Sequence, residues 1–266
     1  MEEPGFHLRL LGGFALDRAS GGAAPVLRQR RSEGVLAVLA VSADLGCSRD
    51  RLIAYFWPES PESKARHNLR DALYALRQTL GSDAVLNAGD GLRMNPGVIR
   101  ADVQAFEEAL QEGQLAKAVA LHRGPFLDGF HVEGSHEFGL WVESERARLA
   151  QDRQQAVKQL AKRAEREERW DAAAEWWGRA LAGDRFNSRL LVRRMVALTR
   201  AGDRANAVME GEQHCRTLTS ELGLDPDPAL LEELERIREG AAGPAQFFTP
   251  PPAPETGSPT DPSARG

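Results

Sequence analysis

The feature that most constrains this chain is a proline-broken corner between two helical stretches in residues 51–80. The first stretch has an apolar end, and the sequence PESP follows it at positions 58–61. Pro58 cannot continue a helix, whereas Ser60 offers a hydroxyl N-cap and Pro61 is tolerated at a first helical position. The sequence therefore predicts a short, stiff corner, which is typical of a helix-turn-helix.

An apolar seam runs along the second of these helices. Its members recur at spacings of four, four, three and four residues, namely Ala65, Leu69, Leu73, Leu76 and Leu80. This periodicity turns one stripe of the helix toward a core, and Gly81 is expected to end the helix. The seam predicts a long helix that packs on one side.

The other side of this helix is polar and rich in cations. Opposite the seam, or along one edge of it, lie Ser63, Lys64, Arg66, His67, Arg70, Asp71, Tyr74, Arg77 and Gln78. Arg, Lys and His side chains donate hydrogen bonds to phosphates and guanine edges, and a helix of this size fits the major groove of DNA. The pattern predicts a recognition helix; the alternative is an ordinary solvated helix face.

The candidate DNA-binding residues of this helix differ in expected role. Lys64 and His67 lie in the N-terminal half, which usually enters the groove, and are candidates for base contacts. Tyr74 is a further candidate on the outer face. The candidates for phosphate contact are Arg66, Arg70 and Arg77. For these arginines the alternative is pairing with Asp71 and neighbouring carboxylates.

The residues before the corner predict a small unit of strands and helices. Short strands are expected at residues 6–11, 14–16 and 25–27. A first helix follows three cations, Arg28, Arg30 and Arg31. These arginines are candidates either for contacts with the DNA backbone or for a solvated helix start. Ser48 is a suitable N-cap for the next helix.

A hairpin is expected after the long helix. A Gly-Asp-Gly turn at residues 89–91 stands between two short strand-like runs. Two strands about a tight turn after a recognition helix predict a wing. Residues 1–100 are thus predicted to form a winged-helix domain of a size that can fold alone.

From about residue 101 the pattern changes to helices alone and becomes repetitive. Residues 169–174 (RWDAAA) and 202–207 (GDRANA) stand 33 residues apart, and residues 113–118 (GQLAKA) are a fainter copy. A tight turn and small residues at this period are typical of tetratricopeptide repeats, which gain their core by stacking. Residues 101–240 are therefore predicted to form one all-α domain. The proline-rich residues 241–266 are predicted to be a disordered tail or linker.

Composition and charge set further limits. Only two cysteines occur, far apart, which favours a reducing compartment over a disulfide framework. No segment approaches the ~20 apolar residues of a membrane span, so a cytoplasmic protein with no membrane partner is expected. Residues 1–100 hold 13 Lys/Arg against 11 Asp/Glu, a net charge of +2, and residues 101–266 hold 21 against 28, a net charge of −7. This asymmetry fits a mildly basic nucleic-acid module joined to an acidic interaction module.

The sequence gives little support for an enzyme. His131 and His136 have neither the spacing of a helical metal pair nor that of a zinc ribbon, and no phosphate-binding glycine loop occurs. No catalytic residue, metal or cofactor is therefore predicted.

Several dispersed motifs resemble one class of bacterial regulators. The first half is similar to the response-regulator-type (OmpR-like) winged helix of the antibiotic-regulatory-protein (SARP) class, through Leu10-Leu11-Gly12 with Phe14, residues 52–60 and residues 65–73 (ARHNLRDAL). The second half resembles the bacterial transcriptional activator domain (BTAD), through residues 101–106, 124–130 (GPFLDGF), 141–146 (WVESER) and 221–226 (ELGLDP). The resemblance runs from Phe6 to Glu239.

This resemblance implies an α+β winged helix-turn-helix domain followed by an all-α, tetratricopeptide-like domain. It implies an activator that binds promoter DNA, as a homodimer on direct repeats, and contacts RNA polymerase or another protein through its helical repeats. Two departures are the sequence Ser32-Glu33-Gly34, expected to interrupt the first helix at its start, and residues 184–186, where the family often has Asp-Pro. The rival prediction is a repeat scaffold without specific DNA binding.

Overall fold

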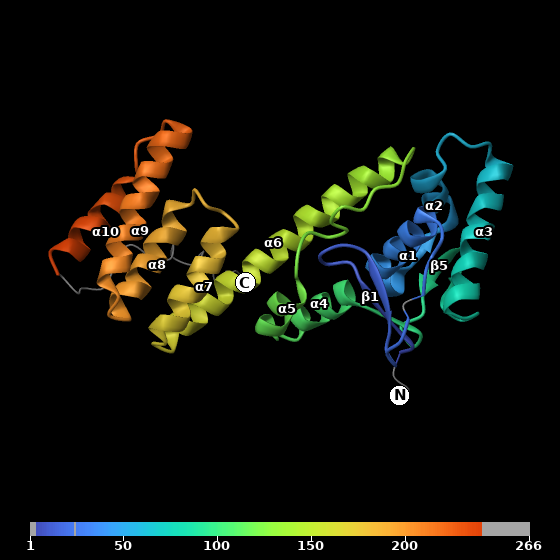
Figure 1. Cartoon of the computed structure of the whole chain (residues 1–266), viewed down its shortest axis with the longest axis horizontal. Coiled ribbons are helices and arrows are strands. Elements are labelled where there is room, and N and C mark those ends of the chain that lie inside the picture. Colours follow the sequence, from blue (N-terminus) through green and yellow to red (C-terminus); the bar gives the residue numbers. More distant parts are fainter. Residues whose placement is uncertain (1–3, 24, 241–266) are drawn as a thin grey trace, which may run out of the picture.

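The computed structural model describes residues 4–23 and 25–240, and it shows an elongated molecule with two unlike ends (Figure 1). Small sheets and three helices form one end, and a stack of antiparallel helices forms the other. This is the predicted winged helix-turn-helix followed by helical repeats. The tail predicted at residues 241–266 lies outside the described residues.

The first sheet contains three strands in the order β2-β1-β6. β1 (Phe6–Arg9) pairs antiparallel with β2 (Ala15–Arg18) and parallel with β6 (Ile99–Ala101). The strand predicted at residues 25–27 is wrong, because this segment is not part of a sheet. The place beside β1 is taken by β6, and Pro25 has no N–H to donate to a ladder.

Three helices form the helix-turn-helix and its support, namely α1 (Arg30–Ser42), α2 (Arg49–Phe56) and α3 (Glu62–Leu80). Ser48 caps α2 as predicted, since its hydroxyl accepts a hydrogen bond from the Arg51 amide at 3.2 Å. The start of α3 lies one residue later than predicted. Pro61 has an extended ψ of 143° and is itself the N-cap residue.

The interruption predicted in the first helix is also wrong. α1 begins at Arg30 and runs unbroken through Ser32, Glu33 and Gly34. Gly34 is needed there for packing, because a Cβ at this position would lie 2.6 Å from a ring carbon of Phe56. The glycine therefore lets α1 approach α2 closely.

The second sheet is the predicted wing. β4 (Val85–Ala88) and β5 (Gly91–Met94) form an antiparallel hairpin, and the short β3 (Cys47–Ser48) pairs with the other edge of β5. Because β3 leads directly into α2, the wing is attached to the start of the helix-turn-helix.

The repeat end consists of seven helices among the described residues. They are α4 (Asp102–Gln111), α5 (Leu115–Leu121), α6 (His136–Arg166), α7 (Trp170–Ala182), α8 (Ser188–Arg200), α9 (Arg204–Thr217) and α10 (Pro228–Arg238). A π-helical turn, Leu218–Leu222, extends α9.

The three repeat turns share one hydrogen-bond pattern. The amides of Gln114, Arg169 and Asp203 each donate to the carbonyl five residues earlier, at 2.8, 2.9 and 2.8 Å. The preceding residue has positive φ in every case, 72° at Gly113, 53° at Glu168 and 90° at Gly202. These turns lie at the start of the three similar sequence segments, so the sequence repeat corresponds to a structural repeat.

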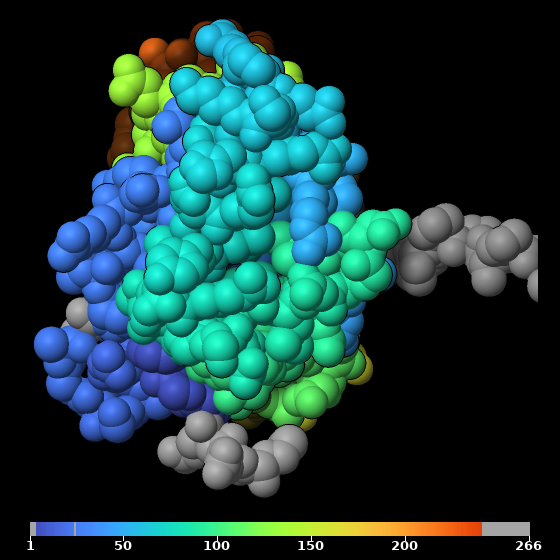
Figure 2. All heavy atoms as spheres, turned by 90° about the vertical axis from the view of Figure 1, so that its right-hand side faces the viewer, coloured from blue at the N-terminus to red at the C-terminus, as the bar shows by residue number. Residues whose placement is uncertain are grey.

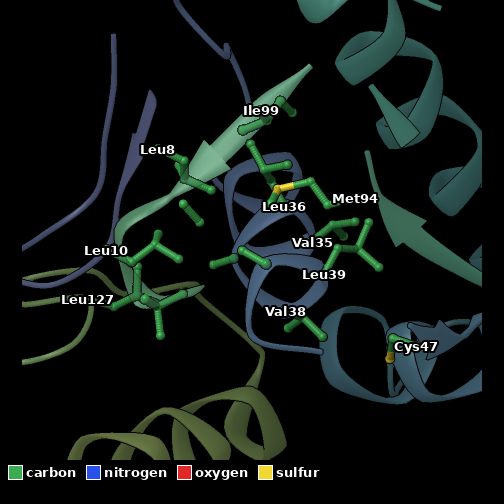
Figure 3. Close-up of a cluster of buried hydrophobic side chains, with 14 of the residues drawn as sticks. Leu8, Leu10, Val35, Leu36, Val38, Leu39, Cys47, Met94, Ile99 and Leu127 are labelled. Atoms are coloured by element: carbon green, nitrogen blue, oxygen red, sulfur yellow. The ribbon is translucent and has the colours of Figure 1, made fainter. Parts of the chain in front are cut away.

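One hydrophobic core joins the winged helix to segments beyond residue 100. Leu127 lies beside Leu10 in this core, as the close-up in Figure 3 shows, and its amide donates to the Leu10 carbonyl at 2.8 Å. The carboxylate of Asp102 accepts hydrogen bonds from the amides of Leu10 and Leu11 at 2.8 and 3.0 Å. Burial raises the pKa of Asp102, while these two N–H groups oppose that rise.

An aromatic cluster attaches the start of α6 to the same core. The Phe138 ring lies 4.7 Å from Phe56 of α2, 6.2 Å from Phe130 and 5.5 Å from Trp141, measured between ring centroids. Tyr55 of α2 contacts Trp141 at 5.9 Å. The packing therefore continues across the expected boundary near residue 100, and the division of function at that point stays a prediction.

Candidate nucleic-acid interface

The face of α3 opposite its apolar seam forms one end of the molecule. Figure 2 views this end and shows α3 as an uncovered ridge across it. All five members of the predicted seam are buried, from Ala65 to Leu80, and Gly81 ends the helix with a φ of 106°. The 19 residues of α3 give a rod of about 28 Å. The buried seam thus fixes which side chains point away from the protein.

Two cations of this face have no partner in the protein. Lys64 and Arg70 are both exposed, and neither makes a hydrogen bond or ion pair with any residue that the structure describes. Tyr74, one turn beyond Arg70, is 66% exposed. These three side chains lie ready to contact a ligand without first breaking an internal interaction.

Two other candidates are paired with nearby carboxylates. Arg66 lies 2.8 Å from Glu62 and 3.7 Å from Asp50, and the His67 ring lies 3.3 Å from Asp71. All of these side chains are exposed, and exposed pairs are typically worth only about 0–1 kcal/mol. The alternative of carboxylate pairing is therefore observed for Arg66, and His67 has a carboxylate neighbour that was not predicted, but both pairs are weak enough for a phosphate to replace the carboxylate.

Arg77 links α3 to the wing. Its Nη2 and Nε atoms donate to the carbonyl of Val85, in β4, at 3.1 and 3.4 Å. The guanidinium therefore holds the base of the wing against the C-terminal end of α3. A phosphate contact by Arg77 stays a prediction.

Arg30 and Arg31 make contacts elsewhere in the protein. Arg31 donates to the carbonyls of Phe56 and Glu133, both at 3.0 Å, and so connects α1 to the end of α2 and to the loop before α6. Arg30 lies 3.2 Å from Glu33 and over the Phe130 ring at 5.0 Å. Burial raises the pKa of Glu33, and the Arg30 charge opposes that rise. The structure thus gives both arginines internal roles, and contact with DNA stays a prediction for them.

Arg49 is a further candidate residue that was not predicted from the sequence. This first residue of α2 donates to the Asp90 carbonyl, in the wing turn, at 2.8 Å and to the Asn87 side-chain oxygen, in β4, at 2.7 Å. Residues 87–91 carry an aspartate and no cation, so Arg49 is what brings positive charge to the wing tip. The sequence did carry one indication. A cation in the first turn of a helix interacts unfavourably with the helix dipole, so an arginine at this position is expected to have another role.

Replacement of Arg49 by Ala is expected to weaken duplex binding about tenfold while the fold persists, because a hydrogen bond to a charged group is worth about 1.5–3 kcal/mol and the wing loses its clamp. Fluorescence anisotropy with a labelled duplex measures this loss. Arg51→Ala is the matched control, since Arg51 carries the same charge on the same helix but bonds Tyr55 instead of the wing. Equal losses for both variants would show that charge alone matters.

Metal sites and membrane-spanning helices were also sought among the described residues. No group of three metal-ligating side chains lies close enough together to hold an ion in residues 4–23 and 25–240. Over the same ranges, no helix has the length and apolar character to cross a membrane.

The fold and this interface define a class of protein, a winged helix with an exposed basic helix joined to a stack of helical repeats. Residues 96–238 match the bacterial transcriptional activator domain family. The chain belongs to this family, which is one of transcription regulators rather than of enzymes. The predicted resemblance to SARP-class regulators is confirmed.

Two known proteins extend the comparison. The chain is 28% identical over 228 residues to the regulatory protein AfsR of Streptomyces griseus, covering 78% of this chain and 22% of AfsR. The chain therefore spans about a fifth of the length of this curated relative. The fold is similar to that of Mycobacterium tuberculosis EmbR in complex with a low affinity phosphopeptide, with a TM-score of 0.62 at 23% identity, covering 90% of this chain and 66% of the EmbR chain.

Proposed function

We propose that this protein is a sequence-specific DNA-binding regulator that activates transcription. α3 enters the major groove, the wing contacts the adjacent backbone, and the helical repeats contact RNA polymerase or another protein. The observation that carries the proposal is the uncovered face of α3, on which Lys64 and Arg70 have no partner among the described residues.

The distribution of these side chains along α3 supports separate roles. Lys64 and His67 lie in the first half of the helix, where base edges are usually read, and Arg70 lies six residues beyond Lys64, near the middle. A lysine or arginine can donate to guanine in the major groove, and any of these cations can contact a phosphate. Membership of an activator family supports activation rather than repression.

Selection of duplexes from a random pool by the full chain tests this proposal. A DNA-binding regulator enriches a common sequence, and its affinity for that sequence falls linearly with the logarithm of salt concentration. The selected duplex, placed upstream of a promoter, should then raise transcription by purified polymerase. The rival function, a repeat scaffold, predicts that no sequence is enriched and that duplexes are not retained at low salt.

The proposal includes the binding of two protomers, as a homodimer, to direct repeats in the DNA. Regulators that bind direct repeats as pairs gain affinity by linked binding without new DNA contacts. Selected sequences that contain two half-sites in the same orientation would support such a pair. A single half-site that binds with full affinity would show that one protomer suffices.

A further inference from the structure

The repeat domain contains a basic hollow between α5, α6 and α8. It has a volume of about 410 Å³, and its lining includes Leu115 of α5, Lys162, Arg163 and Arg166 of α6, and Arg193 of α8. Lys162, Arg163 and Arg166 recur at helical spacing, so they share one face of α6. We call this surface the α6 hollow.

Two cations of the α6 hollow remain without carboxylate partners. Glu165, which also lines it, is held by the Trp177 indole N–H at 2.8 Å and by Arg193 at 3.1 Å. Arg163 is paired with Glu167 at 3.0 Å. Neither Lys162 nor Arg166 forms an ion pair with another residue in the described part of the chain; Arg166 only donates to the Lys162 carbonyl. The hollow therefore presents uncompensated positive charge.

The positive charge of the α6 hollow contrasts with the net negative charge of the domain as a whole. Residues 151–200, which include the second half of α6 together with α7 and α8, hold 12 Lys/Arg against 7 Asp/Glu, a net charge of +5. Residues 101–150 hold 4 against 9, and residues 201–240 hold 4 against 10, net charges of −5 and −6. Positive charge is concentrated in the segment that contains the hollow.

We infer that the α6 hollow binds a short acidic segment of a partner protein, whose carboxylates contact Lys162 and Arg166 and whose apolar side chain packs on Leu115. This inference deepens the proposed function by naming the surface through which the repeats contact protein. A DNA duplex fits less well, because it carries one negative charge per about 1.7 Å along its axis and would extend beyond the hollow over a domain whose other segments are acidic. A short acidic segment can be confined to the hollow.

Fluorescence anisotropy of the full chain with a labelled peptide of alternating glutamate and leucine tests the inference. The chain is expected to bind this peptide, with an affinity that falls as salt is added, and not its glutamine-for-glutamate analogue. The double variant Lys162→Glu/Arg166→Glu should bind about tenfold more weakly or worse, because like charges would then face each other. The matched control is Arg179→Glu/Arg216→Glu, which makes the same change in charge on α7 and α9 and should bind within about twofold of the parent chain.

Peptide binding tests this inference, and duplex binding tests the proposed function, so the two can fail separately. The hollow variant should still bind the selected duplex through α3, whereas failure of the parent chain to bind any duplex would defeat the proposed function alone. The inference is overturned if the parent chain does not bind the acidic peptide, or if both double variants lose peptide binding equally. It is also overturned if duplex displaces the peptide and duplex binding requires Lys162 and Arg166. Circular dichroism checks folding, and Lys162→Gln/Arg166→Gln replaces the glutamate variant if that variant misfolds, with the same expected order.

Discussion

A fragment that ends at Arg100 is expected to be largely unfolded, whereas one that ends at Gln151 should unfold cooperatively. The shorter fragment lacks large side chains that complete the core of the winged helix, namely Phe106, Phe126, Leu127, Phe130 and Phe138. Burial of each is worth about 1.5–3 kcal/mol. Their combined loss is comparable with the entire free energy of unfolding of a typical domain, about 5–15 kcal/mol. The shorter fragment also lacks Asp102, which satisfies the amides of Leu10 and Leu11.

Circular dichroism during urea titration measures both fragments. The fragment ending at Gln151 retains the whole core, whose last buried member along the chain is Leu149, and is the matched control. A sharp unfolding transition for the fragment ending at Arg100, at the same urea concentration as for the longer one, would contradict the prediction. It would show instead that residues 1–100 fold alone, as the sequence suggested.

Replacement of both Lys64 and Arg70 by Ala is expected to weaken binding to the selected duplex by about a hundredfold or more. A base contact or a charged phosphate contact is worth about 1–3 kcal/mol, and the slope of affinity against salt should fall by about one unit for each lost phosphate contact. Stability should hardly change, because both side chains are exposed and have no partner among the described residues.

The double variant Arg179→Ala/Arg216→Ala removes the same charge from α7 and α9 and serves as the control. Anisotropy titrations at several salt concentrations give the affinity and the slope for each variant. If the two double variants have the same affinity and slope, the exposed face of α3 is not the DNA interface. Separate single variants then show whether Lys64 affects the selected sequence more than random DNA, which is the mark of a base contact.

The parts of the fold that local sequence determines were predictable. The seam of α3 and its end at Gly81 follow from periodicity and from one residue type, and the wing follows from a Gly-Asp-Gly turn. The repeats were visible because each turn places small residues at the same offset. The parallel pairing of β6 with β1 was not predictable, since those strands lie about ninety residues apart and no local pattern specifies the partner. The strand expected at residues 25–27 does not form, because β6 occupies the place beside β1 and Pro25 has no N–H to donate to a ladder.

The roles of the arginines were predictable only in part. The exposed face of α3 followed from the seam, so the positions of Lys64 and Arg70 could be deduced. The internal contacts of Arg31, Arg49 and Arg77 could not, because their acceptors are mainly backbone carbonyls outside their own helices, 25, 41 and 8 residues away along the chain. Every residue type carries such a carbonyl, so sequence does not mark the acceptor as it marks an aspartate or a glutamate.

The unbroken length of α6 sets the angular relation between the two ends of the molecule. Its 31 residues extend over about 46 Å, with the first part packed on α2 and the last part on α7. Each residue added to the middle of such a rod would rotate the repeats by about 100° around it, relative to α3. Only insertions close to whole turns, such as about 7 or 11 residues, would keep the α6 hollow on the same side of the molecule relative to α3. The length of α6 therefore fixes the direction in which the α6 hollow faces relative to the exposed face of α3.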